Sequence, residues 1–128
     1  PTALAAEAGQ WEVVKDLAAR KANLEAKGEK HGVTPTALAA EAGQLEVVKD
    51  LAARNANVDA KDEYGMTPMA LAAKAGQLEV VKDLAARNAN LEAKDKDGRT
   101  PMALAAEAGQ LEVVKDLARS VLMPVSFF

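Results

Sequence analysis

The chain has 128 residues, a formal net charge of −3 at pH 7 and no cysteine. Hydrophobic residues make up 49% of it, but 29 residues are alanine, so the core must be thin. Only four residues are aromatic, and we therefore expect no large interior cavity for a cofactor. Acidic and basic side chains alternate along the chain instead of forming a basic face, which argues against binding to nucleic acid.

The cellular location is indicated only by features that the sequence lacks. Without cysteines the chain forms no disulfide bond, which suits the reducing cytoplasm. No signal peptide is visible, although the chain opens on Pro1 in the middle of a repeat, so its true start stays open. The apolar segment 121–128 is too short to span a bilayer, unless a longer apolar stretch begins there. We expect a cytoplasmic protein without membrane contact.

A repeat of about 33 residues dominates the sequence. The segments 43–57 and 76–90 are identical, and the segment 9–23 differs from them only at Trp11 and Lys21. The period is set by Pro1, Pro35, Pro68 and Pro101, which are 34, 33 and 33 residues apart. Such a period is typical of a stacked solenoid. We predict one elongated domain over residues 1–120, with repeats at about 1–34, 35–67, 68–100 and 101–120, followed by an apolar tail at 121–128.

The first helix of each unit is predicted to begin at a Thr-Pro pair. In the third repeat, the Thr67 hydroxyl can cap the helix, and Pro68 occupies the first turn, where its missing N–H does no harm. Residues Met69–Ala75 follow as a short alanine-rich helix. Gly76 supplies the left-handed residue that ends it.

Residues Leu78–Arg87 are predicted to form a second helix. One apolar stripe on it consists of Leu78, Val81, Leu84 and Ala85, and on the outer side Asp83 is spaced to pair with Arg87. Asn88 is the expected left-handed residue after the helix. Residues 89–93 run extended, and 95–98 make a tight turn. The fold class is therefore an all-α repeat of helix-turn-helix units with projecting β-hairpin loops, stabilised by contacts between neighbouring repeats.

Three segments of the third repeat carry a family resemblance. They read TPMALAA at 67–73, GQLEVVK at 76–82 and NANLEA at 88–93, and they resemble the TPLHLAA, GHLEVVK and GADVNA of the ankyrin repeat. The resemblance recurs four times, from residue 1 to about 118. It implies an ankyrin solenoid whose hairpin tips and first helices line a concave groove that engages another protein.

The chain departs from the family pattern at both histidines. The first is alanine in every copy, so the buried histidine hydrogen bonds that tie neighbouring hairpins are in question; the second is glutamine, at Gln10, Gln44, Gln77 and Gln110. The first loop carries one extra residue within 27–32, for which we expect a bulge. Copies this similar suit either a designed, consensus-like array or a recently duplicated natural one.

The copies differ mainly at the loop tips and on the first helices, where the resemblance places the groove. The candidate partner-binding residues are His31, Val33, Glu63, Tyr64, Met66, Lys74, Lys96, Asp97, Arg99 and Glu107. Tyr64 and Met66 would be an exposed anchor for a partner protein, unless the tips merely tolerate any residue. Arg99 would pair with a partner's carboxylate or be only solvated.

No arrangement of residues points to catalysis or to a metal site. His31 is the single histidine, and the only serines, Ser120 and Ser126, lie at the opposite end of the solenoid. The segment 95–98 matches a calcium loop only in part, because the remaining ligands are missing. We expect no enzyme activity, no cofactor and no metal.

The ends of the array support a second hypothesis, self-association. Solenoids need polar caps, and neither end repeat has a polar pattern. Phe127 and Phe128 of the tail either fold back over the last repeat or insert into a neighbouring chain, which would give a homo-oligomer. The last helix is expected to reach about Met123, before Pro124 stops it. Trp11, which replaces a leucine, either fills space or makes an end-on contact.

Overall fold

The computed structural model describes residues 32–122, with side chains described as far as Val121. The helices are α3 (Pro35–Glu41), α4 (Leu45–Ala53), α5 (Pro68–Ala75), α6 (Leu78–Ala86), α7 (Pro101–Glu107) and α8 (Leu111–Leu122). The first repeat and Trp11 lie outside the described residues, and so do residues 27–31 of the loop 27–32 in which we expected a bulge. Residues 123–128 of the predicted tail 121–128 also lie outside them, whereas residues 121 and 122 belong to α8.

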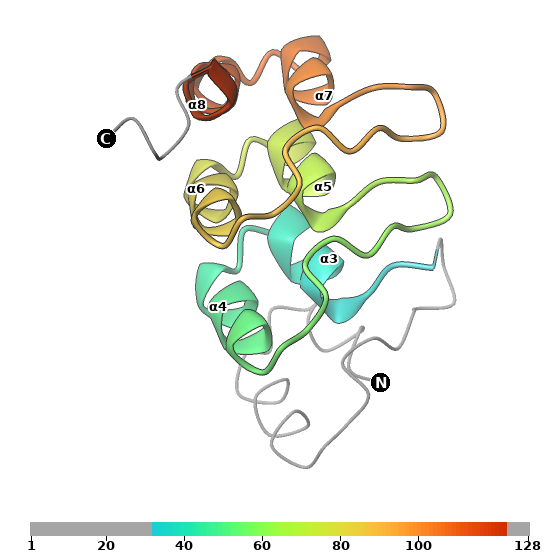
Figure 1. Cartoon of the computed structure of the whole chain (residues 1–128), viewed down its shortest axis with the longest axis vertical. Coiled ribbons are helices and arrows are strands. Elements are labelled where there is room, and N and C mark those ends of the chain that lie inside the picture. Colours follow the sequence, from blue (N-terminus) through green and yellow to red (C-terminus); the bar gives the residue numbers. More distant parts are fainter. Residues whose placement is uncertain (1–31, 123–128) are drawn as a thin grey trace.

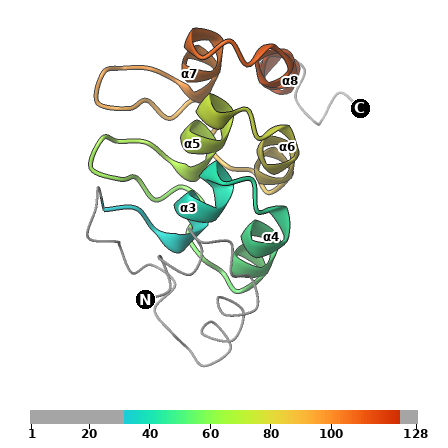
Figure 2. The ribbon, with the colours of Figure 1, turned by 180° about the vertical axis from the view of Figure 1, so that it is seen from behind.

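The helices stack in two columns. The first helices of the repeats, α3, α5 and α7, form one column, and the second helices, α4, α6 and α8, form the other (Figures 1 and 2). The loops that precede α5 and α7 project away from the second column. This is the predicted all-α repeat. No strand is described between residues 32 and 122, so the predicted β-hairpin form of the loops is not confirmed.

Local sequence explains where the helices begin and end. The Thr67 hydroxyl accepts a hydrogen bond from the Ala70 backbone N–H at 3.1 Å, and Pro68 is the first residue of α5. Gly76 ends α5 with a φ of 76°, and Asn88 follows α6 with a φ of 62°. In the third repeat the predicted helices therefore agree with the structure to within one residue at each end.

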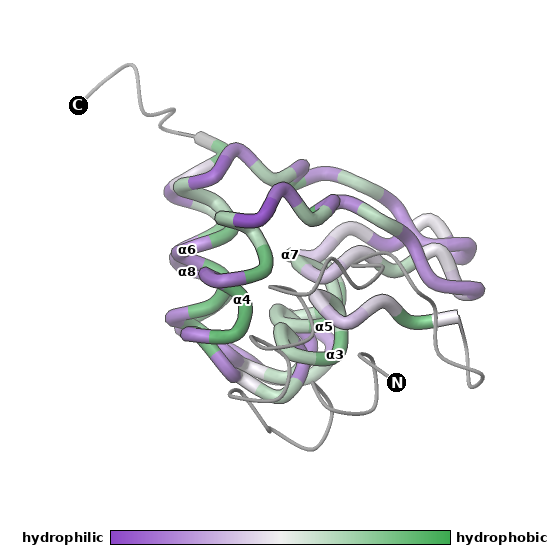
Figure 3. Tube along the Cα trace, turned by 90° about the horizontal axis from the view of Figure 1, so that it is seen from below, coloured by the Kyte–Doolittle hydropathy of each residue, from purple (hydrophilic) through white to green (hydrophobic). Residues whose placement is uncertain are grey.

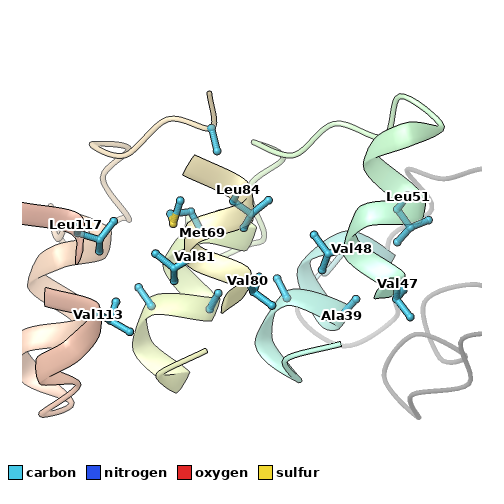
Figure 4. Packing of buried hydrophobic residues seen from close by; sticks show 14 of the residues in the cluster. Ala39, Val47, Val48, Leu51, Met69, Val80, Val81, Leu84, Val113 and Leu117 are labelled. Atoms are coloured by element: carbon cyan, nitrogen blue, oxygen red, sulfur yellow. The ribbon is translucent and has the colours of Figure 1, made fainter. Parts of the chain in front are cut away.

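The core lies between the two columns and continues through all the described repeats. The projecting loops are mostly hydrophilic, whereas the helices carry both hydrophilic and apolar residues (Figure 3). Val81 and Leu84 of the predicted stripe are fully buried, while Leu78 and Ala85 are only partly buried. Val80, which the predicted stripe omitted, is 1% exposed. It is buried because α6 packs against both α4 and α8, so its buried surface is wider than one stripe (Figure 4).

Glutamine side chains connect successive repeats. The Gln77 side-chain amide donates to the Glu41 carbonyl at 3.1 Å, and the Gln110 amide donates to the Lys74 carbonyl at 3.2 Å. Each bond joins the start of a second helix to the end of the first helix one repeat earlier. The residue that replaces the family's second histidine thus ties neighbouring repeats together.

Two buried threonines at the start of α3 differ in hydrogen bonding. The Thr34 hydroxyl accepts from the Ala37 backbone N–H at 3.3 Å, whereas the Thr36 hydroxyl is buried without a partner. Thr36 occupies the position of Met69 in the next repeat, and both are 0% exposed. This variable position of the first helix therefore faces the core and not the groove that we expected.

We predict that Thr36→Val stabilises the protein by about 1 kcal/mol, because a methyl group replaces an unpaired buried hydroxyl at constant shape. The matched change Thr34→Val should destabilise it by about 1 kcal/mol, because it removes the helix cap. Urea unfolding of the two variants and of the parent measures both shifts. Shifts of the same sign would contradict the assignment of the two hydroxyls.

Candidate partner-binding surface

The loop tip at residues 62–66 is held by an aspartate. Asp62 Oδ1 accepts hydrogen bonds from the backbone N–H groups of Tyr64 and Met66, both at 2.9 Å. The Asp62 N–H donates to the Met66 carbonyl at 3.0 Å, and Gly65 turns the chain with a φ of 79°. Tyr64 is therefore presented from a well-bonded turn, and it is 49% exposed.

The next tip, at residues 95–99, repeats this arrangement. Asp95 Oδ1 accepts from the N–H groups of Asp97 and Arg99 at 2.9 Å, and the Asp95 N–H donates to the Arg99 carbonyl. The Asp95 side chain is 3% exposed. The sequence pattern predicted the turn at 95–98 but not that the Asp95 side chain holds it. An aspartate three residues before a glycine was the available signal, since Asp side chains bond their own backbone two residues on.

Neighbouring tips are joined through their backbones. The Lys96 N–H donates to the Tyr64 carbonyl at 3.0 Å. A Cβ placed on Gly65 would lie 3.0 Å from the Lys96 nitrogen, so the two tips are in close backbone contact. Further along the loops, the Asn90 N–H donates to Asp59 Oδ1 at 3.0 Å. The two described tips thus form one continuous edge.

Six of the candidate binding residues lie on the surface of these tips and first helices. Glu63, Tyr64, Lys74, Lys96, Asp97 and Glu107 are all exposed; we call this set the tip surface. Lys74 and Glu107 occupy equivalent positions near the ends of α5 and α7. His31 lies outside the described residues.

Two of the candidate residues are buried. Val33 is 9% exposed and Met66 is 7% exposed, and both belong to an apolar cluster with Ala37, Ala70, Leu71 and Leu104. The expectation that Met66 is an exposed anchor is therefore wrong. In these two copies the residue just before the Thr-Pro pair packs against residues of the first helices, so its apolar side chain fills the core.

Arg99 is engaged within its own chain. Its guanidinium lies 3.2 Å from carboxylate oxygens of Asp95, Asp97 and Glu107, and its side chain is 40% exposed. We expected Arg99 either to pair with a carboxylate of a partner protein or to be only solvated, and neither expectation included ion pairs within its own chain. Arg99 follows the Asp95 turn, where Met66 and Val33 stand in the other copies. It therefore orders the last described tip and links that tip to α7.

Hydrogen bonding stabilises the charged form of Asp95. The backbone N–H of Arg99 is the largest influence, and with the Asp97 N–H and the guanidinium it lowers the pKa of Asp95 despite the burial of the carboxyl group. Because the pKa in the folded state lies below the usual value of about 4, this carboxylate stabilises the fold above that pH. The stabilisation is lost as the pH falls through the folded-state pKa.

We predict that Asp95→Asn lowers the free energy of unfolding by about 1–2 kcal/mol at pH 7. The difference from the parent should shrink as the pH falls from about 4 through the lowered folded-state pKa of Asp95, because the parent then loses the stabilisation that its carboxylate provides. Urea titrations between neutral and acidic pH measure this difference. Asp97→Asn is the control, because its side chain is 76% exposed and a surface ion pair contributes little. A pH-independent difference for Asp95→Asn would contradict the role of its charge.

Between residues 32 and 122, no three His, Cys, Asp or Glu side chains are grouped so as to hold a metal ion. None of the helices in this range combines the length and the apolar character needed to cross a membrane.

Two comparisons agree with this repeat geometry. A family model described as ankyrin repeats (three copies) matches residues 54–121, and one described as a single ankyrin repeat matches residues 31–63. No curated protein matches the chain. Ankyrin repeats generally act as modules that bind other proteins. The stacked helix pairs, the projecting loops and the two family matches agree, and the chain belongs to the ankyrin repeat family.

Proposed function

We propose that this chain is a non-enzymatic cytoplasmic module that binds another protein through its tip surface. The observation that carries the proposal is Tyr64. It is the single aromatic residue between positions 32 and 122, and it is 49% exposed on a turn that Asp62 holds. Exposed tyrosines are enriched in interfaces because they combine a large apolar ring with a polar hydroxyl group.

The tip presents Tyr64 in a restrained form. The hydrogen bonds to Asp62 and the backbone bond to Lys96 limit the motion of the turn, so binding would lose less conformational entropy than with a free loop. Partial burial and the neighbouring Glu63 carboxylate raise the pKa of Tyr64, and its hydroxyl group is protonated at neutral pH as in an ordinary tyrosine. A neutral donor beside exposed charges of both signs suits a polar protein surface better than a phosphate backbone.

Comparative affinity capture from a lysate of the source cells tests this proposal. The parent chain is expected to retain a protein that Tyr64→Ala and Lys74→Ala fail to retain. After purification of that protein, Tyr64→Ala should weaken binding at least tenfold in calorimetry, as expected for an aromatic hot spot.

The matched control is Lys82→Ala, which removes an exposed lysine on α6, outside the tip surface. This variant should bind like the parent. Capture that survives Tyr64→Ala but is lost with Lys82→Ala would place the binding surface on the second helices and overturn the proposal.

Self-association is the alternative function. It would use either the ends of the array or the tail, with Phe127 and Phe128 inserted into a neighbouring chain. Both phenylalanines lie outside the described residues. The end of the array that α7 and α8 form is described, and its exposed surface supports a specific form of self-association.

A further inference from the structure

The last repeat exposes a face that is buried in the repeats before it. Ala73 is 0% exposed, whereas Ala106, at the same position one repeat later, is exposed. Other positions change in the same direction: Met69 to Met102, Ala70 to Ala103, Val81 to Val114 and Leu78 to Leu111. Leu111 is 62% exposed, which makes it one of two exposed large hydrophobic residues in the described part of the chain. We call this set the end face: Met102, Ala103, Ala106, Leu111 and Val114.

The repeats themselves show what covers such a face. Gln110 packs on Gly76 so closely that a Cβ there would lie 2.6 Å from the Gln110 Cδ, and its amide donates to the Lys74 carbonyl. Gln77 packs on Gly43 in the same way and donates to the Glu41 carbonyl. Each covered face thus receives the glutamine of a following repeat together with its apolar helices.

Beside the end face lie the same glycine and the same backbone carbonyl that bind the glutamine of a following repeat inside the array. Gly109 has a φ of 75°, as Gly76 has 76°, but no heavy atom lies within 4 Å of a Cβ placed on it. The carbonyl of Glu107 stands where those of Glu41 and Lys74 accept glutamine amides. In sequence, Pro68–Ala85 and Pro101–Ala118 differ only at Lys74 and Glu107. The face is therefore chemically a repeat–repeat interface without its second half.

We propose that the end face binds the first repeat of a second copy of this chain, head to tail. The first repeat carries Gln10 after Gly9, as the internal repeats carry Gln77 after Gly76 and Gln110 after Gly109. Gln10 of the incoming copy would donate to the Glu107 carbonyl and pack on Gly109. Because the two surfaces differ, each added copy leaves a new end face, and the contact propagates instead of closing a dimer.

This contact shares only Glu107 with the tip surface, and it would use the backbone carbonyl of Glu107 and not its side chain. None of the end-face residues belongs to the tip surface, so Tyr64→Ala should leave self-association unchanged. Failure of one proposal therefore does not imply failure of the other.

Size exclusion with light scattering across a concentration series tests the contact. We expect the mass of the parent to rise with concentration past twice the monomer mass of 13.4 kDa. Ala106→Arg should keep the chain monomeric, since it places a charged side chain on the end face at an exposed position. Ala86→Arg is the matched control, because Ala86 and its equivalent Ala53 are both exposed inside the array, and this variant should assemble like the parent. Circular dichroism verifies that both variants are folded.

A mixing experiment fixes the direction of the contact. Gln10→Glu replaces the amide donor with a carboxylate that would face the Glu107 carbonyl, and this variant alone should be monomeric. Mixed with Ala106→Arg, it should form a species of twice the monomer mass and nothing larger, because one end face and one first repeat remain intact. Trp11, the single tryptophan, directly follows Gln10, so its emission should shift on mixing.

Three results would overturn the proposal. One is a parent that stays monomeric at every concentration. Another is a parent that becomes larger only after deletion of residues 123–128, which would make the tail the occupant of the end face. The third is a dimer that Gln10→Glu leaves intact while Ala106→Arg abolishes it, since that would be a symmetric contact between two end faces.

Discussion

Replacing Leu84 with alanine is expected to lower the free energy of unfolding by about 3 kcal/mol. Leu84 is 0% exposed and lies in the cluster that runs through the described repeats (Figure 4). Because alanine already fills much of the core, few large side chains are available to close the resulting cavity. Helix α6 also contacts both α4 and α8, so the loss weakens the interfaces with both neighbouring repeats. Urea unfolding followed by circular dichroism measures the change.

The same substitution at Leu111 provides the control. Leu111 is 62% exposed, so Leu111→Ala should change the free energy of unfolding by no more than about 0.5 kcal/mol. The comparison is made at a protein concentration where the parent is monomeric, because Leu111 belongs to the end face. Equal losses for the two variants would mean that the contacts between repeats do not determine stability.

Gly76→Ala is expected to destabilise the protein by about 2–3 kcal/mol. The left-handed backbone, with a φ of 76°, accounts for about 1–2 kcal/mol of this when a Cβ is added. The added methyl group would also displace the Gln110 side chain, whose Cδ lies 2.6 Å from the new atom. This displacement breaks the 3.2 Å hydrogen bond from Gln110 to the Lys74 carbonyl, which lowers the free energy of unfolding by about another 1 kcal/mol.

Gly109→Ala separates these two contributions. Gly109 has nearly the same φ, 75°, but a Cβ there meets nothing within 4 Å, so only the backbone strain of about 1–2 kcal/mol applies. In a Gln110→Ala background, Gly76→Ala should cost no more than Gly109→Ala does, because the glutamine contact is already absent. Urea unfolding of the four variants completes the cycle. If Gly76→Ala still costs more stability than Gly109→Ala in the Gln110→Ala background, the extra cost does not come from the glutamine contact.

Sequence patterns predicted the single repeat well. Thr67, Gly76 and Asn88 were identified as the residues that begin and end the helices, and each adopts the expected hydrogen bond or backbone conformation. The pair Asp83 and Arg87 forms as predicted, with 2.8 Å between Oδ2 and Nε. These features depend on residues within one helical turn of each other, which is the range that a sequence pattern describes.

The candidate binding residues were predicted less well. Met66 and Val33 occupy variable positions at the tips, but they point into the core, while Arg99 at the same position forms ion pairs within its own tip. Variation among the copies marked the position and not the direction of the side chain. The direction depends on how the loop folds back over the first helices, which involves residues of more than one repeat.

The third and fourth repeats separate what the sequence determines from what only the tertiary structure decides. Through Pro68–Ala85 and Pro101–Ala118 they differ at one position, and both form the same pair of helices with the same threonine cap. Ala73 is nevertheless fully buried, whereas Ala106 is exposed. Helices and turns follow from local backbone preferences that each copy carries in full. Burial depends on whether another repeat packs against the face, and no residue within the repeat specifies that.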